Sequence, residues 1–439
     1  MNKAFLAVSL ALFLTACDSF SKKPPLPGVR EIYLDFTSGD LLPDPDFKGK
    51  KVSVPAARPL KAFPQALINF DTEHVPYVAT LSESPVWSLS IGEGETPEHR
   101  FLGHPVSDGH VIFVSDTLGK ISAVKELGKD KGAEILWTFD SIPEEARDSA
   151  GCATLAFYEG TLFVATAIGD IIALDPVKAA DGQVKIKWRT SFGAPIRSMP
   201  AVKDGRLFVT GINGMTAALD AVKGTLLWTH QGFTEVSSIQ GGASPVVKDD
   251  LVVSTYSSGE IFVMKAESDV PLWSDTMTTA LRSDSISSIP HIVGNPIVDG
   301  NILYVISHGG RMAAFDLSTG LTSWQQDIGS IRSPLLIGQV LFVLDNNNRV
   351  VCLDKSSGKV HWVSPLPVSD EKKALLWTAP VAVNDQLVFG SSGGDLVFMR
   401  MADGTKVKSF QLKDGIVSQP IVVNDHLYLL LSSGQLIRH

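Results

Sequence analysis

The stretch Arg311–Trp324, read R-M-A-A-F-D-L-S-T-G-L-T-S-W, decides the fold of this chain. Its first residues alternate as a β-strand does. Asp316 and Gly320 favour a tight turn, because Asp hydrogen-bonds its own backbone and Gly accepts positive φ. Trp324 then lies on the next strand and can fold back beside the small Ala314. The stretch therefore predicts a hairpin in which an indole ring covers an alanine.

The same pattern recurs along the chain. A glycine, or once Asn348, stands in a turn between two apolar strands, where positive φ is needed, and a proline such as Pro200 or Pro296 begins most units. One unit is four strands in about 45 residues, which is typical of a propeller blade. An aromatic residue marks the outer strand of each unit, and the series is Trp87, Trp137, Trp188, Trp228, Trp273, Trp324, Trp362 and Phe410.

Counting the units predicts how the ring closes. Seven units carry all four strands, whereas the eighth runs from Pro420 to His439 and lacks its fourth. A spare strand at 85–89, which contains Trp87, precedes the first complete unit and can pair with the strand at 435–438. We therefore expect an all-β, eight-bladed β-propeller of four-stranded antiparallel blades, closed by an N-terminal strand that completes the last blade. Such closure leaves no open sheet edge at the joint.

The composition excludes several classes of function. The chain has 439 residues, 44% of them apolar, and a formal net charge of −9. No basic stripe is visible, so nucleic acid is not an expected partner. Three cysteines with no C-x-x-C spacing indicate neither a zinc site nor a disulfide framework.

The N-terminus reads as a lipoprotein signal. Residues 1–16 hold a lysine, a short apolar run and Leu-Thr-Ala before Cys17, whose thiol would carry the lipid. Residues 17–80 are rich in proline and are interpreted as a lipid-anchored, mostly extended arm, and residues 81–439 as the propeller. No other run approaches the ~20 apolar residues that span a bilayer. We expect the body to lie in an aqueous compartment outside the cytoplasm.

Other candidate chemistry fails on its context. The run at 390–394 matches G-x-S-x-G, but it lies in a predicted β-hairpin with no helix after it. The histidines show no metal-binding spacing. Cys352 takes the alanine place of the repeat, and Cys152 is expected to be buried. Trp377 falls outside the aromatic series and in a connection between blades, so we expect its replacement to cost less stability than that of Trp87 and to affect binding instead. No catalytic, metal-binding or cofactor-binding residue is predicted.

The repeat Ala-x-Asp-x-x-Thr-Gly-x-x-x-Trp, best matched by Ala314–Trp324, resembles that of PQQ-like propellers. With the lipobox and eight blades, the chain resembles the BamB family, and its long arm is similar to the α-proteobacterial form. The resemblance implies a non-enzymatic scaffold without a cofactor on the periplasmic face of the outer membrane. It would assist folding and insertion of outer-membrane proteins by binding the periplasmic domains of a BamA-like subunit and other assembly subunits, and would otherwise be monomeric. Asp18 resembles an inner-membrane retention signal.

The resemblance also implies where the partner binds. The family presents a Leu-x-Leu-Arg-Gly run before one blade and an Asp-x-Asp run before the next. The first aligns with 237–241, where Ile239 keeps an apolar side chain and Gln240 replaces the arginine. The second aligns with 290–293, which includes His291 and lacks both acids. We expect either that the same face binds the partner with altered electrostatics, or that this face no longer binds a partner.

Two alternatives to this reading stay open. PQQ-dependent dehydrogenases share the repeat, but they resemble one another in an adjacent cysteine pair, a calcium shell and an aspartate base. In this chain Cys152 and Cys352 lie four blades apart. A propeller scaffold for another envelope partner is the other alternative.

Overall fold

A computed structural model describes residues 41–66, 69, 73–128, 131–149, 151–178, 183–233, 239, 241–278, 289–367 and 375–439. These residues belong to the compact unit Asp40–His439. Cys17, Asp18 and Gln240 lie outside the described residues, as does the first part of the predicted arm. Among the described helices, none is long and apolar enough to cross a membrane.

The described elements are almost entirely strands, with two short 3-10 helices, η1 (Pro45–Phe47) and η3 (Glu144–Ser149). The strands of the first half of the chain are, in order, β1 (Trp87–Ser90), β2 (Val106–Ser107), β3 (Ile112–Ser115), β4 (Lys120–Glu126), β5 (Ala133–Asp140), β6 (Ala153–Tyr158), β7 (Thr161–Thr166), β8 (Asp170–Lys178), β9 (Val184–Ser191), β10 (Ala201–Lys203), β11 (Arg206–Thr210), β12 (Met215–Asp220), β13 (Leu226–Gln231), β14 (Val246–Lys248), β15 (Leu251–Thr255), β16 (Glu260–Lys265) and β17 (Pro271–Thr276).

The remaining strands are β18 (Ile297–Asp299), β19 (Ile302–Ile306), β20 (Met312–Asp316), β21 (Thr322–Gln326), β22 (Leu335–Ile337), β23 (Val340–Leu344), β24 (Arg349–Asp354), β25 (Val360–Pro365), β26 (Val381–Val383), β27 (Gln386–Gly390), β28 (Asp395–Arg400), β29 (Lys406–Gln411), β30 (Ile421–Val423), β31 (His426–Leu430) and β32 (Gln435–Arg438).

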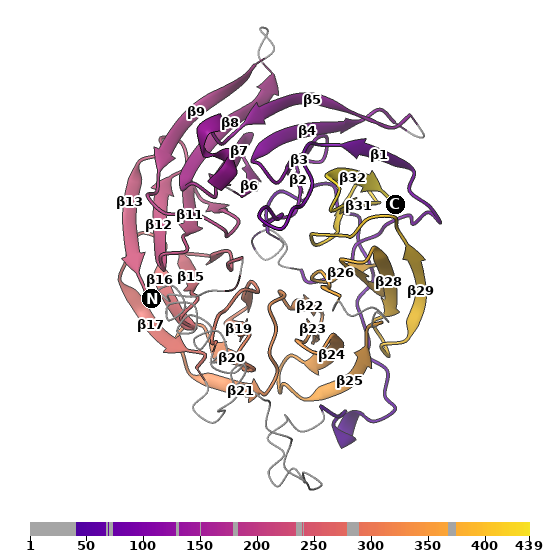
Figure 1. Cartoon of the computed structure of the whole chain (residues 1–439). Coiled ribbons are helices and arrows are strands. Elements are labelled where there is room, and N and C mark those ends of the chain that lie inside the picture. Colours follow the sequence, from indigo (N-terminus) through magenta and orange to yellow (C-terminus); the bar gives the residue numbers. More distant parts are fainter. Residues whose placement is uncertain are drawn as a thin grey trace, which may run out of the picture. The chain divides into compact units, whose positions relative to one another are not determined.

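These strands form eight four-stranded antiparallel sheets arranged as a ring, which confirms the predicted eight-bladed propeller (Figure 1). Blades 1 to 7 are β2–β5, β6–β9, β10–β13, β14–β17, β18–β21, β22–β25 and β26–β29, each in sequence order from the centre outward. Turns between first and second strands, and between third and fourth, share one face, which we term the hairpin face. Connections between blades share the other, which we term the connection face.

Blade 8 closes the ring with both ends of the chain. Its order is β1-β32-β31-β30, so the N-terminal strand supplies the outer position. Trp87 pairs with Arg438, and Ser90 with Gln435, in an antiparallel register. The predicted closing strand is confirmed, although its boundaries shift by one or two residues.

The stretch Arg311–Trp324 forms the predicted hairpin. Ala314 and Trp324 are register partners in β20 and β21. Asp316 Oδ1 accepts a hydrogen bond from the amide of Thr319 at 2.9 Å, which shapes the turn. Gly320 has φ +74°, and a Cβ there would lie 2.7 Å from the ring of Trp273 in the preceding blade. Glycine is therefore required here for two reasons: the backbone has positive φ, and a side chain would collide with the neighbouring indole.

The tryptophans bind one blade to the next. The indole N–H of each repeat tryptophan reaches forward to an oxygen of the following blade, at 2.7 to 3.1 Å. The acceptors are Glu126 Oε1 for Trp87, and backbone carbonyls for the others: Pro176 for Trp137, Ala221 for Trp188, Ala266 for Trp228, Leu317 for Trp273, Lys355 for Trp324 and Met401 for Trp362. Phe410 has no such donor and packs against His439 instead.

Residues 41–80 lie on the propeller instead of extending away from it. Their described part contains no strand, yet its backbone and side chains bond to the blades throughout. The segment first crosses the outer edge of blades 6 and 7. There the Asp44 amide donates to the Val360 carbonyl at 2.8 Å, and the Val52 amide donates to the Ala402 carbonyl at 2.9 Å.

The described residues between 60 and 80 then follow one circuit of the channel on the hairpin face and contact the innermost part of every blade. Because this circuit ties all eight blades together, it reinforces the closure made by β1. The contacts, from blade 8 round to blade 8 again, are Leu60 with Asn424, Phe63 with Ser107, Pro64 with Phe157, Gln65 with Val202, Asn69 with Val247, His74 with Asp299 and with Gly338, Tyr77 with Ala382, and Thr80 with Asp425.

Candidate functional site

The structure brings together two of the residues expected to form the partner surface. Ile239 lies in the connection from blade 3 to blade 4, and His291 lies in the connection from blade 4 to blade 5. The amide of Ile239 donates a hydrogen bond to Nδ1 of His291 at 3.0 Å. Both connections belong to the connection face, so the two predicted runs meet beside blade 4.

His291 is a buried support for this loop. Its side chain is 3% exposed. Burial, with the positive charge of His308 as a smaller cause, lowers the pKa of His291 to about 4. The imidazole is therefore neutral at neutral pH, and because Nδ1 accepts, the proton sits on Nε2. His291 itself does not reach a partner, whereas Ile239 is only half-buried.

A small hollow lies next to this pair, between blades 3, 4 and 5. Its volume is about 30 Å³, room for about two water molecules and far less than a cofactor needs. Arg197 lines it, is half-buried, and forms no ion pair with any described residue. Tyr256 lines it too, and its hydroxyl bonds Thr216 at 2.9 Å, while burial raises the pKa of that phenol. Nothing in the repeat marks Arg197, so it could not be singled out from the sequence.

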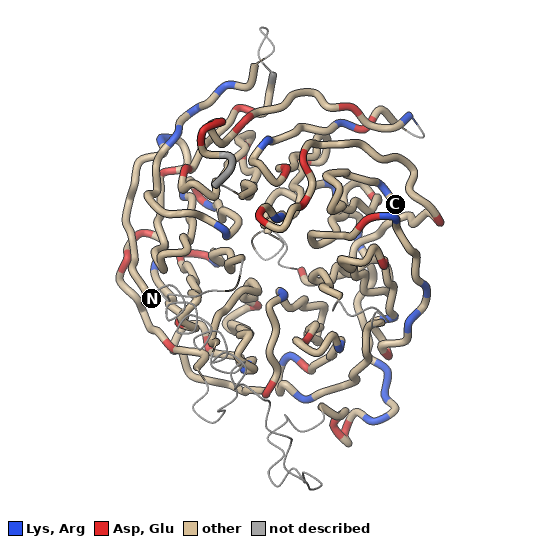
Figure 2. Tube along the Cα trace, in the orientation of Figure 1, with Lys and Arg blue, Asp and Glu red and all other residues tan. Residues whose placement is uncertain are grey.

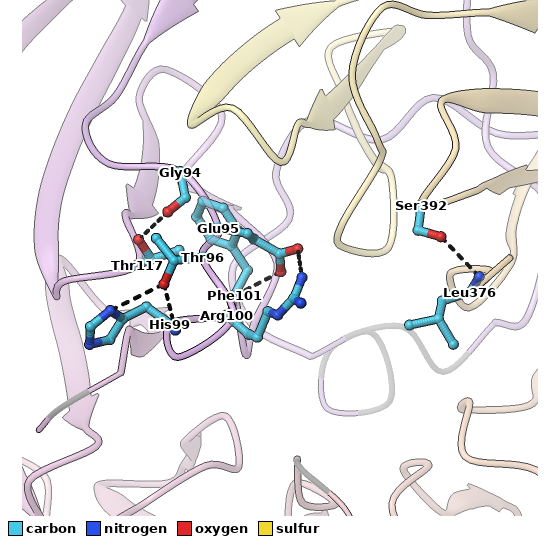
Figure 3. A network of polar contacts seen from close by, with 9 residues as sticks. All are labelled: Gly94, Glu95, Thr96, His99, Arg100, Phe101, Thr117, Leu376 and Ser392. Carbon is cyan, nitrogen blue, oxygen red and sulfur yellow. Dashed lines mark hydrogen bonds and ion pairs between the residues drawn. The ribbon is translucent and has the colours of Figure 1, made fainter. Parts of the chain in front are cut away.

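A second structured loop lies on the connection face, between β1 and β2 (Figure 3). Arg100 Nη1 pairs with Glu95 at 2.8 Å, and the other oxygen of Glu95 accepts from the Phe101 amide at 3.2 Å. Thr117 Oγ1 donates to the Gly94 carbonyl at 2.7 Å and so ties the loop to blade 1. In the sequence, only the charged residues of this loop set it apart from the other connections between blades.

Charges are dispersed over the ring. Figure 2 shows Lys and Arg interspersed with Asp and Glu along the described trace, with no stripe of one sign. Among the described residues, no group of three or more His, Cys, Asp or Glu is placed to hold a metal ion.

The two described cysteines are buried and unpaired, Cys152 in blade 2 and Cys352 in blade 6. Burial raises the pKa of the Cys152 thiol to about 12, so it is not a nucleophile at neutral pH. Cys352 is the register partner of Trp362, the alanine position of the repeat, as expected. The G-x-S-x-G run at 390–394 joins β27 to β28, which confirms the hairpin.

One expectation about Trp377 is wrong. A smaller cost than that of Trp87 requires a less buried side chain, yet Trp377 is 2% exposed against 8% for Trp87 and belongs to a core cluster with Trp362 and Phe389. The isolated β-bridge between Trp377 and Ser391 draws this connection into the blade. A tryptophan outside the repeat can therefore still be a core residue, because blade-to-blade connections fold over the ends of the sheets.

The eight four-stranded blades, in five of which the repeat tryptophan pairs with an alanine or a cysteine, define the class as an eight-bladed PQQ-like propeller. Comparison with known proteins then gives the family. The model for "Outer membrane protein assembly factor BamB" matches residues 120–364, more than half of the chain. The chain belongs to the BamB family.

Individual relatives agree with this assignment. Outer membrane protein assembly factor BamB of Yersinia pestis is 27% identical over 371 residues, covering 80% of this chain and 88% of the relative. The crystal structure of BamB from Moraxella catarrhalis aligns with a TM-score of 0.63 at 19% identity, covering 81% of this chain and 98% of that one. A europium-containing methanol dehydrogenase aligns equally well, with a TM-score of 0.63 at 17% identity, covering 84% and 89%. Structural likeness at these identities shows the fold alone.

Proposed function

We propose that this protein is a periplasmic scaffold lipoprotein of the β-barrel assembly machinery. It assists the folding and insertion of outer-membrane proteins by binding the periplasmic domains of a BamA-like subunit. Membership of the BamB family is the single observation that carries this proposal. No chemical step is assigned to the chain, which acts by holding its partners.

The partner surface is proposed on the connection face around blade 4. Ile239, which is half-buried, supplies an apolar contact, and Gln240 next to it supplies a polar one. His291 acts through Ile239, since its ring accepts the Ile239 amide from a buried position. Arg197 at the adjoining hollow offers a positive charge with no described partner, which compensates for the arginine replaced by Gln240.

Anchoring is proposed through lipid on Cys17, with the body on the periplasmic face of the outer membrane. Asp18 keeps inner-membrane retention as the alternative location. Residues 17–40 are proposed as the lipid-anchored arm. The remaining residues of the predicted arm belong structurally to the propeller, as the contacts of 41–80 support.

The quinoprotein alternative shares the fold but lacks support from the site. The methanol dehydrogenase aligns as well as the BamB structure does, so fold similarity does not separate the two. The difference lies in the residues: Cys152 and Cys352 sit in different blades, and the hollow beside His291 is about 30 Å³. We therefore favour the scaffold.

Co-purification from solubilised membranes tests the proposal. The protein should recover a BamA-like subunit, and Ile239→Asp should reduce the recovery about tenfold, because a carboxylate would be desolvated in the interface. Leu321→Asp is the matched control, since Leu321 is 70% exposed and lies on the hairpin face. Full recovery with Ile239→Asp, or recovery of a cytochrome instead, would contradict the assignment.

A further inference from the structure

The outer edge of blade 3 repeats that of blade 6, position by position. In blade 6, Val360 begins the outer strand β25 and pairs with Leu353. In blade 3, Leu226 begins β13 and pairs with Leu219 in the same register. The two apolar side chains thus occupy equivalent places on the hairpin face.

The surroundings of these two residues are also equivalent. Gly358 lies against the ring of Trp324, and Gly224 lies against the ring of Trp188, each with φ +70°. A Cβ would meet the indole at 2.6 Å in the first case and 2.4 Å in the second. In both blades, therefore, a glycine turn holds the apolar strand start close to the indole of the preceding blade.

In blade 6 the chain covers this place with its own arm. Leu41 packs against the cluster that contains Trp324 and Val360, and the Asp44 amide donates to the Val360 carbonyl at 2.8 Å. Phe47 stacks on His361, with ring centroids 3.9 Å apart. Val360 is consequently only 6% exposed. A short segment with apolar side chains at both ends, the second in the 3-10 turn η1, thus covers the edge of the blade.

In blade 3 no described residue covers the equivalent place. Leu226 is 59% exposed, Leu227 beside it 47%, and Val222 in the same turn 79%. The indole of Trp188 is left half-buried, although that of Trp324 is buried. Single exposed apolar residues need no explanation, but several exposed apolar residues in one turn and the strand after it indicate an interaction site.

The charges of the covered site indicate what the uncovered one would bind. Lys359 holds the acidic residues of the arm, with Nζ 3.5 Å from Asp44 and 2.6 Å from Asp46. In blade 3, Lys223 stands in the corresponding turn, at the position of Ser357 and two residues before the position of Lys359, and is exposed, with no ion pair to a described residue. A ligand with carboxylates next to an apolar side chain would complement both Lys223 and Leu226.

We propose that the edge of blade 3 formed by Val222, Lys223, Leu226 and Leu227 is a docking site for a short peptide segment of another protein. That segment carries an apolar side chain followed by carboxylates, as Leu41–Phe47 does. A peptide fits better than a membrane surface, because the edge strand β13 offers backbone groups that a peptide can bond and lipid cannot. The site lies on the hairpin face, so it is separate from the connection-face surface and does not depend on the proposed function.

The chain itself supplies the probe. A fluorescent synthetic peptide of residues 40–50 is titrated onto the full-length protein held in lipid nanodiscs. Blade 6 is already occupied intramolecularly, so the free edge of blade 3 should bind the peptide saturably. Leu226→Glu should weaken binding about tenfold or more, since it removes apolar burial and adds a repelling charge. Lys223→Glu should weaken it as well, and added salt should weaken wild-type binding.

Ile135→Glu is the matched control, because Ile135 occupies the same register place in blade 1 and is 37% exposed. It should leave binding unchanged. Absence of saturable binding, or equal binding by the Leu226→Glu protein, would overturn the proposal. Sedimentation of the peptide-free protein provides the other decisive outcome: self-association that Leu226→Glu abolishes would make the occupant a second copy of this chain and the proposal wrong.

Discussion

Trp87 donates its indole N–H to Glu126 Oε1 at 2.8 Å and so joins β1, the first described strand, to β4, the third strand of blade 1. Arg438, the penultimate residue, donates to the same oxygen at 2.9 Å. One carboxylate thus holds both chain ends at the joint between blade 8 and blade 1. In every other tryptophan-bearing joint, the indole acceptor is a backbone carbonyl.

The joint predicts a stability effect at Trp87, which is 8% exposed. Trp87→Ala should lower the free energy of unfolding by about 3–5 kcal/mol, because a large buried side chain is removed. Thermal unfolding measures it, with Leu321→Ala as the exposed control. Deleting residues 81–91 should go further, since it exposes the edge of β32 and promotes association. An unchanged melting temperature for Trp87→Ala would mean that β1 contributes nothing to closure.

The channel circuit predicts a second effect, at Gln65. This side chain is 3% exposed, accepts from the Val202 amide at 3.0 Å and donates to the Val202 carbonyl at 3.3 Å. Gln65→Ala leaves both backbone groups unpaired and should cost about 1–3 kcal/mol in chemical denaturation. Gln411→Ala is the control, because Gln411 lies on the exposed outer strand β29. Equal stability of the two variants would show that the contacts of the channel circuit do not stabilise the propeller.

The buried His291 predicts a pH dependence. Its pKa is lowered to about 4 in the folded protein, whereas the unfolded chain takes up the proton near pH 6.5. The unfolded state therefore binds more protons between these values, and the free energy of unfolding falls as pH falls from about 6.5 to about 4. His291→Gln should remove up to about 3 kcal/mol of that fall.

His104 and His439 contribute in the same direction, because burial lowers both of their pKa values to about 4. The comparison is therefore between variant and wild type, measured by denaturant unfolding across this pH range. His110→Gln, at an exposed position, should leave the pH dependence unchanged. A His291→Gln protein with the wild-type slope would show that His291 is protonated in the fold.

Trp377 and Trp362 predict different responses to phenylalanine. Both indoles are buried in one cluster, but Trp362 Nε1 donates to the Met401 carbonyl at 3.1 Å, while Trp377 Nε1 has no partner among the described residues. Trp362→Phe removes a hydrogen bond that Trp377→Phe does not, so it should cost about 1 kcal/mol more. Trp377→Ala should still cost about 3–5 kcal/mol in thermal unfolding. A larger loss for Trp377→Phe would reveal a hidden acceptor.

The proposed lipid anchor predicts in which cell fraction a Cys17 variant is found. Cys17→Ser should move the protein from membranes to the soluble envelope fraction, because the attached lipid supplies its membrane affinity. Fractionation followed by a salt wash measures this, with Cys152→Ser as the control, since Cys152 is buried in blade 2. Retention of the Cys17→Ser protein in washed membranes would place the anchor elsewhere.

The sequence by itself determined the number of blades, the closure and the indole positions. These features are periodic, and each unit must repeat the same local solution: a turn at Asp316 and Gly320, a strand, and Trp324 over Ala314. Because the pattern occurs in every unit, a unit that departs from it can still be recognised. The missing fourth strand of blade 8 could therefore be identified as the strand that contains Trp87.

Only the tertiary structure decided what lies outside the period. The path of residues 41–80 over the blades could not be predicted, because this segment contains no repeat. Each of its hydrogen bonds reaches a different blade that is far away in sequence, as the bond between Gln65 and Val202 shows. The same holds for the burial of Trp377 and His291 in connections between blades. Leu226 and Val360 are alike in sequence context, and their exposures differ because the arm reaches one and not the other. Long-range contact of a non-repeating segment therefore sets which repeated positions remain open for a partner.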